Sequence, residues 1–259
     1  MDFYSIRGLL FDLDGTVYRG QTAISGAVDF FQQLSLPYLF VTNRANRTPA
    51  EVAGQLRGMG IRCDDDHVLT SAQATAEYLS RDANIFVLGE KGLKRELELR
   101  NCRIAGYEEP TPDAVVVSYD RGFNYKKLTQ AVRYIDEGAR FIATNDDTII
   151  TVEDGILPEA GPLVAAISNA TGMEPELIGK PSRPIMNIAM KRMDLLKKEV
   201  AIVGDNLFTD IQAGKNSGLK TILILTGVSN SQDPRIYNIL PDLVVSNYYE
   251  LSLALEGRG

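Results

Sequence analysis

Short, continuous runs of aliphatic residues alternate with helical patterns in the first and last thirds of this chain. The runs are "GLLF" (8–11), "YLFV" (38–41), "VAIVG" (200–204), "KTILILTG" (220–227) and "DLVV" (242–245). Helical patterns follow most of them, at 25–34, 48–60 and 209–217. Strands that are apolar at every position are buried on both faces, which is typical of a parallel sheet covered by helices. The alternation therefore predicts an α/β fold built on a parallel sheet.

The middle of the chain repeats this rhythm as a unit of its own. Apolar runs stand at 84–89, 114–120 and 140–145, and amphipathic helices are expected at 125–138 and 161–172. No Pro- or Gly-rich linker and no internal repeat marks the joins. Periodicity alone places them near residues 80 and 177, so we expect the middle of the chain to form an α/β unit of its own.

Composition excludes several classes of partner. The 259 residues carry a net charge of -7, with a pI near 4.9, which argues against nucleic acid or an anionic membrane. No apolar stretch reaches spanning length, and the N-terminus lacks a signal-peptide pattern. Cys63 and Cys102 cannot form a disulfide framework, so we expect the reducing cytoplasm. The oligomeric state is left open, a homo-oligomer included.

Two acids close the first apolar run. Asp12 and Asp14 stand one residue apart in "FDLDGT", where the strand leaves the core and Gly15 turns the chain away. Carboxylates that close repel each other unless a cation or a shared proton relieves them. The stretch is either a turn with helix-capping acids or a metal-assisted catalytic site.

Three more polar stretches follow later runs. Thr42 ends the second run, Lys180 follows the short apolar "ELI", and Asp205 closes the run at 200–204, five residues before Asp210. In open α/β sheets, ligands bind outside the carboxyl ends of the strands. The residue types suit phosphoryl transfer, because a carboxylate can attack phosphorus and carboxylate oxygens bind Mg²⁺. Lysine and threonine can neutralise and hold the phosphoryl oxygens.

Taken singly, each of these residues has an ordinary explanation. Thr42 could be a hydrogen-bonding residue at a strand end, Lys180 a solvated surface lysine, and Asp210 a helix-start acid favoured by the helix dipole. Four such signals in order, each closing an apolar run, favour a catalytic site. Cys63, His67 and Cys102 are too few and too scattered for zinc.

The stretches "FDLDGTVYRG", "FVTNRANRTP", "IGKPSRPIM" and "VGDNLFTDIQAGKNSGLKTILILTGVS" resemble the four motifs of the haloacid dehalogenase superfamily of phosphohydrolases. The best match is its NagD-like, 4-nitrophenylphosphatase-like subgroup, and the resemblance covers essentially the whole chain. It implies a Rossmann-like parallel-sheet core at 1–79 and 177–259, with an inserted α/β cap at 80–176.

The resemblance also implies roles. Asp12 would be the nucleophile, and Asp14 the general acid that then acts as base. Mg²⁺ would be held by Asp12, by the backbone carbonyl of Asp14, by Asp205, and by Asp210 through a bound water. An acid at position 14 fits phosphatases and phosphomutases.

Substrate contacts are implied in the same way. Thr42 and the Asn43 amide would hold the phosphoryl group, which Lys180 would bridge to Asp12. The subgroup's specificity loop matches "ATNDD", so Asn145 and Asp146 are candidates for touching the leaving group; the alternative is that they cap a turn.

One departure concerns the second motif. Where many subgroup members read "TNN", this chain reads "TNRAN". Arg44, a candidate substrate ligand, could hold a second anionic group or a sugar hydroxyl, or simply face solvent. Arg47 adds further positive charge nearby.

The sequence thus predicts a Mg²⁺-dependent phosphomonoesterase that hydrolyses small-molecule phosphate esters through an aspartyl-phosphate. Polyol, glycolate and sugar phosphates are the expected substrates, with 4-nitrophenyl phosphate as a generic one. The alternatives are a phosphomutase and a catalytically silent sensor of a phosphorylated ligand. The silent sensor is disfavoured because the chain keeps all of the residues that catalysis would need, namely Asp12, Asp14, Lys180 and Asp205.

Overall fold

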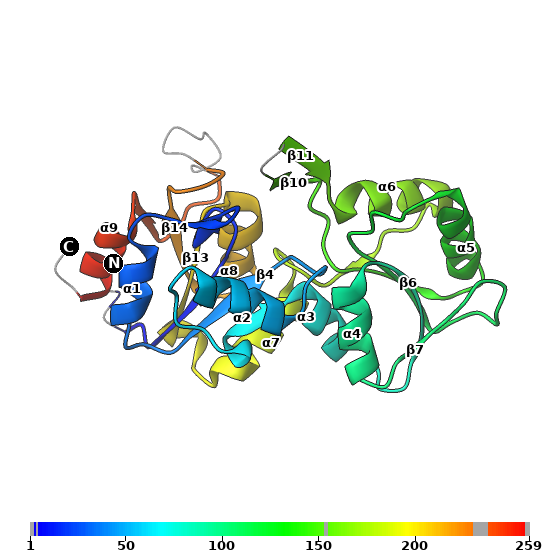
Figure 1. Ribbon diagram of the computed structural model, residues 1–259, viewed down its shortest axis with the longest axis horizontal. Coiled ribbons are helices and arrows are strands. Elements are labelled where there is room, and N and C mark those ends of the chain that lie inside the picture. The colour runs from blue at the N-terminus through cyan, green and yellow to red at the C-terminus, as the bar shows by residue number, and fades with distance from the viewer. Residues whose placement is uncertain (1–2, 4, 153–154, 230–237, 257–259) are drawn as a thin grey trace. The chain divides into compact units, whose positions relative to one another are not determined.

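The computed structural model describes residue 3 and residues 5–152, 155–229 and 238–256, and the chain folds into two compact units (Figure 1). The first unit comprises Met1–Thr42, Pro49–Leu69 and Lys180–Gly259. The second unit comprises Asn43–Thr48 and Thr70–Gly179. This division assigns no role to either unit. It therefore stays a prediction that the hydrolase core comprises residues 1–79 and 177–259 and the cap residues 80–176.

The first unit is built on one sheet whose strands lie in the order β15-β14-β13-β1-β4-β5. The strands are β1 (Gly8–Phe11), β4 (Tyr38–Thr42), β5 (Val68–Thr70), β13 (Val200–Gly204), β14 (Lys220–Ile224) and β15 (Leu243–Val245). Strand β1 pairs in parallel with both β4 and β13, and β14 pairs in parallel with β13 and β15. The parallel sheet that the apolar runs predicted is confirmed.

The order of these strands locates a ligand-binding position. Numbered in chain order, the six strands lie 3-2-1-4-5-6 across the sheet, so the winding reverses between β1 and β13. At such a switch point the connections leave in opposite directions, which opens a crevice at the carboxyl ends of the two strands. Residues just after Phe11 and Gly204 therefore stand at the position where open α/β sheets bind their ligands.

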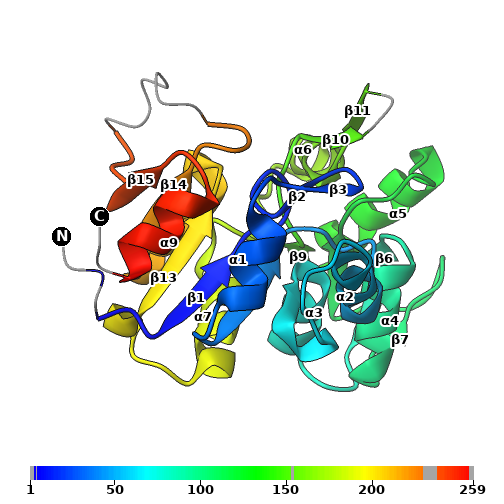
Figure 2. The ribbon, with the colours of Figure 1, turned by 60° about the vertical axis from the view of Figure 1, so that its left-hand side comes forward.

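Helices cover both faces of this sheet (Figure 2). One face packs against α1 (Ala27–Gln33), α2 (Pro49–Gly58) and α9 (Tyr248–Glu256); the other lies against α7 (Arg183–Met193) and α8 (Gln212–Ser217). The first face is rich in aromatic rings, with Phe11 and Phe31 centroids 4.9 Å apart. Such burial on both sides is why the strands carry no polar alternation.

Three short helical turns and a hairpin complete the first unit. They are η1 (Asp65–His67), η2 (Lys197–Glu199), η3 (Leu207–Ile211) and the antiparallel pair β2 (Tyr18–Arg19) and β3 (Thr22–Ala23). One helix was expected near 209–217, but a wide turn, η3, precedes α8. The reason is local, because Asn206 accepts from both the Asp210 and the Ile211 N–H through its carbonyl.

The second unit has its own parallel sheet, in the order β12-β9-β8-β6-β7. Its strands are β6 (Asn84–Leu88), β7 (Arg103–Ile104), β8 (Ala114–Val117), β9 (Arg140–Ala143) and β12 (Glu176–Leu177). Its helices are α3 (Ser71–Tyr78), α4 (Lys91–Leu99), α5 (Tyr125–Asp136) and α6 (Ala160–Thr171). Helices α5 and α6 share one buried cluster with the sheet.

Some elements have no counterpart in the sequence analysis. It missed the helices α3 and α4, the short strands β5 and β7, the hairpin β2–β3, and the antiparallel hairpin formed by β10 (Ile149–Val152) and β11 (Gly155–Pro158). Strand β11 is exposed along its whole length, so no burial pattern marks it. The α/β class itself is confirmed for both units.

Two further observations bear on the composition arguments. Among the described residues, no helix combines the length and the apolar character needed to cross a membrane. Cys63 and Cys102 are both buried free thiols. Burial raises the pKa of Cys63 to about 12, so this thiol stays protonated and unreactive at neutral pH.

A buried carboxyl caps α6 in the second unit. Glu159 is 6% exposed and accepts a hydrogen bond from the Ala160 N–H at the start of the helix. Burial raises the pKa of Glu159, the Ala160 hydrogen bond opposes this shift and the nearby Asp147 carboxylate adds to it, so that the pKa lies at about 7. This carboxyl therefore binds its proton more tightly in the native protein than in the unfolded chain.

We expect Glu159 to make the protein less stable as the pH rises. Between the ordinary glutamate pKa and about 7, the unfolded chain releases a proton that the native protein keeps, so unfolding becomes easier by up to about 3 kcal/mol. Glu159→Gln should therefore melt at a higher temperature than wild type at about pH 8, and at nearly the same temperature at about pH 5. Glu137→Gln, which changes an exposed glutamate of the same unit, is the control. A pH-independent difference between Glu159→Gln and wild type would contradict this interpretation.

Candidate active site

Two acids meet at the switch point of the first sheet. Asp12 directly follows β1, and its N–H donates to the Val203 carbonyl of β13 over 3.0 Å. Asp205 directly follows β13, which pairs with β1 in register. Adjacent parallel strands thus end side by side and deliver both carboxylates to one place, as the sequence predicted.

Lys180 is buried between carboxylates. Its side chain is 1% exposed, and its Nζ lies 2.5 Å from Asp12 Oδ1 and 2.7 Å from Asp210 Oδ1. Burial by itself would lower the pKa of Lys180, but these two carboxylates raise it above its ordinary value. The ammonium is therefore charged, and Lys180 is not the solvated surface lysine of the alternative explanation.

Asp205 and Asp12 are costly to ionise here. The Asp205 carboxylate accepts from Thr16 Oγ1 over 2.8 Å and from the Val228 N–H over 2.6 Å. Burial, followed by the Asp210 carboxylate, nonetheless raises the pKa of Asp205 to about 6. Burial also raises the pKa of Asp12 well above its usual range, with Lys180 opposing this shift. Three carboxylates thus share one buried lysine, which leaves the group short of positive charge.

The same three acids are placed to hold a divalent cation. Carboxylate oxygens of Asp12, Asp205 and Asp210 lie within 4.8 Å of one another. Oxygen ligands are those that Mg²⁺ and Ca²⁺ prefer, and an oxygen that accepts one hydrogen bond keeps a second lone pair. A cation would also supply the positive charge that the group lacks. The donor set therefore fits such an ion.

Glycines make room for Asp205. Gly15 has φ +86°, a left-handed conformation, and a Cβ there would lie 2.6 Å from Asp205 Oδ2. A Cβ at Gly227 would lie 1.9 Å from the same oxygen. Both turns can approach the carboxylate this closely only because they carry no side chain.

Asp14 lies just beyond this group and is half-buried. Its carboxylate accepts from the Tyr18 hydroxyl over 3.3 Å, and the Gly15 N–H donates to the Tyr18 carbonyl over 2.8 Å. The turn is therefore tied to the start of the small hairpin β2–β3. The predicted Mg²⁺ contact through the Asp14 carbonyl stays a prediction.

Thr42 ends β4, beside β1, and is 2% exposed. The next residue, Asn43, already belongs to the second unit. Its carbonyl accepts from Ser71 Oγ over 2.6 Å and from Asn145 Nδ2 over 2.9 Å. The backbone that follows Thr42 is thus held by side chains of the second unit.

The structure places the predicted leaving-group residues differently from one another. Asn145 is completely buried, and its Oδ1 accepts from the Asp147 N–H over 3.0 Å, which is the turn-capping contact of the alternative explanation. Asp146 is exposed and Arg44 is half-buried, with the Arg44 charge acting on Glu159. Contact of these residues with a leaving group stays a prediction.

Sequence reasoning missed two side chains that support this site. Thr16, in the "DGT" turn, donates to Asp205, and its position in the motif could have identified it. The Tyr248 hydroxyl, at the start of α9, donates to the Thr16 carbonyl over 2.9 Å. Burial, with Asp12 and Asp205 nearby, raises the pKa of Tyr248 well above its usual range, so it stays a neutral donor. Nothing in the sequence connects position 248 with this turn.

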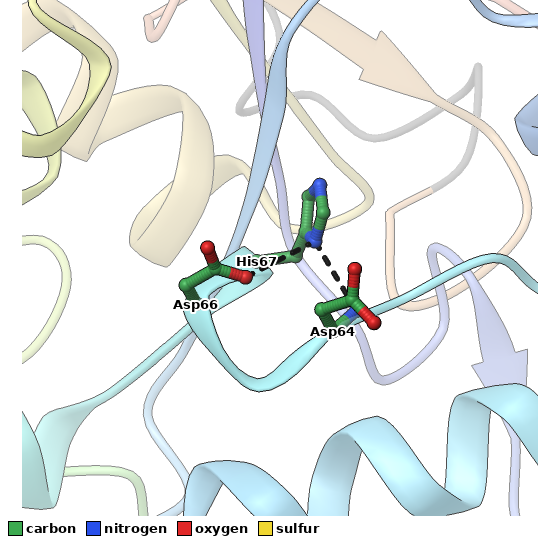
Figure 3. A group of neighbouring side chains, drawn as sticks. All are labelled: Asp64, Asp66 and His67. Atoms are coloured by element: carbon green, nitrogen blue, oxygen red, sulfur yellow. Dashed lines mark hydrogen bonds and ion pairs between the residues drawn. The ribbon is translucent and has the colours of Figure 1, made fainter.

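A second group of candidate metal ligands is Asp64, Asp66 and His67 in the first unit (Figure 3). The His67 Nδ1 accepts a hydrogen bond from the Asp64 N–H over 3.1 Å and lies 3.6 Å from Asp66. The imidazole also stacks on Tyr38, with centroids 4.9 Å apart. The nitrogen that would face a metal is already an acceptor in the cap of η1, so these residues form a local helix cap.

Two family models match this chain. The haloacid dehalogenase-like hydrolase model matches residues 9–103, and the HAD-hydrolase-like model matches residues 177–251. The first contains Asp12 and Thr42, and the second contains Lys180, Asp205 and Asp210. Both models therefore include the residues that the structure brings together.

Curated relatives and a solved structure extend the similarity. The 5'-nucleotidase YutF of Bacillus subtilis is 40% identical over 232 residues, 87% of this chain and 90% of the relative. An acid sugar phosphatase of Staphylococcus epidermidis is 41% identical over 238 residues, 90% of this chain and 91% of the relative. A crystal structure of a glycerol phosphate phosphatase from Mycobacterium tuberculosis in complex with magnesium superposes with TM-score 0.88 at 34% identity, covering 96% of this chain and 77% of that one.

Removing the buried ammonium should destabilise the first unit more as the pH rises. Lys180→Met leaves three carboxylates without their cation, and breaking such a buried pair costs about 3–5 kcal/mol. The loss should shrink toward acid pH, where the carboxylates take up protons. Urea unfolding in EDTA at several pH values measures it.

Lys215→Met is the matched control for this prediction. It removes an ammonium 3.1 Å from Asp242 at a more exposed position, where an ion pair contributes less than about 1 kcal/mol. If Lys180→Met and Lys215→Met lowered the free energy of unfolding equally, the Lys180 ammonium would not be what stabilises the three carboxylates beside it.

Proposed function

This chain belongs to the haloacid dehalogenase-like hydrolases and is a phosphatase of that family, and on this premise we propose that it is a magnesium-dependent phosphomonoesterase acting through an aspartyl-phosphate. The observation that carries the proposal is the Lys180 ammonium held between Asp12 and Asp210 at the switch point, beside Asp205. A buried cation next to ionisable carboxylates is suited to receive a dianionic phosphoryl group.

In the first half of the reaction, Asp12 attacks phosphorus. Lys180 holds Asp12 Oδ1, and this contact orients the other carboxylate oxygen for the attack. The bond from phosphorus to the leaving oxygen breaks as the new bond to Asp12 forms. Asp14 gives its proton to the departing alkoxide, which leaves as an alcohol.

In the second half, water cleaves the aspartyl-phosphate. Asp14, now a carboxylate, takes a proton from the attacking water, and the bond between phosphorus and Asp12 breaks. Inorganic phosphate leaves, and both carboxyl groups return to their starting protonation states. Thr42, the Asn43 N–H and Lys180 hold the phosphoryl oxygens through both steps in this proposal.

Asp12 and Asp205 would hold the magnesium ion directly and Asp210 would hold it through a bound water, with the Asp14 carbonyl as a further ligand. Bound there, the ion supplies charge neutralisation for the phosphoryl oxygens. The grouping of the three carboxylates and the raised pKa values of Asp12 and Asp205 support this assignment. The magnesium complex of the glycerol phosphate phosphatase is consistent with it.

Small phosphorylated metabolites are the proposed substrates. The relatives are named for nucleotides, sugar phosphates and glycerol phosphate, so their names share the phosphomonoester and differ in the leaving group. Polyol, glycolate and sugar phosphates fit this range, with 4-nitrophenyl phosphate as a generic substrate. Arg44, Asn145 and Asp146 are the proposed leaving-group contacts. The two free cysteines favour the cytoplasm as the location.

Replacing the nucleophile should abolish turnover and preserve the fold. Asp12→Asn removes the attacking carboxylate, so phosphate release from 4-nitrophenyl phosphate should fall by at least about a thousandfold. Asp29→Asn, an exposed acid in the first turn of α1, should leave the rate unchanged. Activity of Asp12→Asn within tenfold of wild type would sink the nucleophile assignment. A wild-type protein that binds the ester but releases little phosphate would instead point to a phosphomutase or a sensor.

Chelation tests the metal separately from the nucleophile. EDTA should silence the enzyme and Mg²⁺ should restore it. Mg²⁺ should also raise the melting temperature of EDTA-treated protein by several degrees, because an ion at about 100 times its Kd stabilises the native state by about 2.7 kcal/mol. Asp205→Asn should lose this thermal shift. Full activity after exhaustive chelation, or an unchanged shift in Asp205→Asn, would contradict the metal site.

A further inference from the structure

Three residues of the second unit, Asn43, Asn145 and Asp147, are joined in a closed set of hydrogen bonds through their side chains and backbone. We call this set the Asn43 clamp. Asn43 Nδ2 donates to Asp147 Oδ2 over 3.0 Å, the Asp147 N–H donates to Asn145 Oδ1 over 3.0 Å, and Asn145 Nδ2 donates to the Asn43 carbonyl over 2.9 Å. Asn43 is 8% exposed and Asn145 is completely buried. The clamp thus joins residues about a hundred positions apart in the chain, of which Asn43 and Asn145 are buried and Asp147 is half-buried.

The clamp is anchored to α6 and to α3. The Gly161 N–H donates to the Asp147 carbonyl over 2.9 Å, and a Cβ at Gly161 would lie 2.5 Å from the Asp146 carbonyl, so this loop packs tightly on the start of α6. On the other side, Ser71 Oγ donates to the Asn43 carbonyl over 2.6 Å. Because α6 packs into the core of the second unit, the clamp is fixed to a rigid support.

The clamp acts on the backbone next to a proposed phosphoryl ligand. Two donors fix the Asn43 carbonyl and Asp147 fixes the Asn43 side chain, so the Cα of Asn43 and the nitrogen bonded to it are held in place. That nitrogen carries the N–H which, under the proposed function, holds the phosphoryl group. A misplacement of about 1 Å in such a donor can cost about a hundredfold in rate.

We propose that Asp147 is a positioning residue that holds Asn43, and through it the phosphoryl-binding N–H, in the reactive orientation. This inference rests on the proposed function. It gives two neighbouring acids different roles, since exposed Asp146 is the candidate for the leaving group, whereas Asp147 serves the group that all substrates share. Removing the Asp147 carboxylate should therefore lower kcat/KM equally for every phosphate ester.

The negative charge of Asp147 supports its role as a positioning residue. Its carboxylate raises the pKa of buried Glu159, so it stands where a second negative charge is unfavourable. An amide at position 147 could also accept a hydrogen bond from Asn43, and it would do so without that repulsion. What the carboxylate adds is an ionised acceptor for Asn43 Nδ2, and hydrogen bonds to ionised acceptors are shorter and stronger than neutral ones.

The test compares Asp147→Ala, which removes the acceptor, with Asp147→Asn, which keeps a neutral one. Asp147→Ala should lower kcat/KM by about tenfold or more for 4-nitrophenyl phosphate and for glycerol phosphate alike, and should weaken inhibition by inorganic phosphate. Asp147→Asn should recover most of that loss. Asp136→Ala, an exposed acid at the end of α5, should match wild type.

Three results would overturn the proposal: no loss in Asp147→Ala, a loss confined to one substrate, or equal losses in the alanine and asparagine variants. Melting temperatures identify a folding defect, and amide hydrogen exchange of residues 42–48 gives a readout that needs no turnover. Exchange there should speed up in Asp147→Ala and stay at the wild-type rate in Asp136→Ala. If wild type itself releases no phosphate, the proposed function fails. The exchange rates then decide alone whether Asp147 holds Asn43, and unchanged exchange overturns it.

Discussion

The buried ammonium of Lys180 is the interaction on which the first unit depends. Parallel strands bring Asp12 and Asp205 to one edge of the sheet, and η3 adds Asp210, so the fold concentrates negative charge where water is largely excluded. Without a cation in contact, those carboxylates would have to stay protonated or push the strand ends apart. The Lys180 ammonium compensates part of this negative charge, but one cation does not neutralise three carboxylates. That remaining deficit is what suits the site to a metal ion and an anionic substrate.

The surrounding turns show what this concentration of charge demands. Because Gly15 and Gly227 carry no side chain, Thr16 and the Val228 N–H can reach the two oxygens of Asp205. Tyr248 then fixes the turn from α9. The hydrogen bonds from Thr16 and the Val228 N–H favour the ionised carboxylate, yet burial still raises the pKa of Asp205 to about 6. The local structure therefore lessens the cost of ionisation without removing it, as expected of a site optimised for binding rather than for stability.

Much of this could be predicted from the sequence, for a physical reason. Strands β1, β4 and β13 are short and buried on both faces, so their apolar runs end abruptly at the polar residues that matter. Asp12, Thr42 and Asp205 stood out for that reason. The exposed strand β11 leaves no such pattern, and the wide turn η3 depends on two hydrogen bonds to one carbonyl. Contacts such as Tyr248 with Thr16, or Asp147 with Asn43, join residues far apart in the chain, and periodicity says nothing about them.

The chain passes from one unit to the other next to two residues of the proposed site, Thr42 and Lys180. One boundary falls between Thr42 and Asn43, and another between Gly179 and Lys180. The residues on the far side of each boundary are fixed within the second unit, Asn43 by its clamp and Gly179 by an N–H donated to the Thr144 carbonyl over 2.9 Å. Under the proposed function Asn43 supplies a phosphoryl-binding N–H, so the side chains that hold Asn43 within the second unit would affect the reaction step that all substrates share.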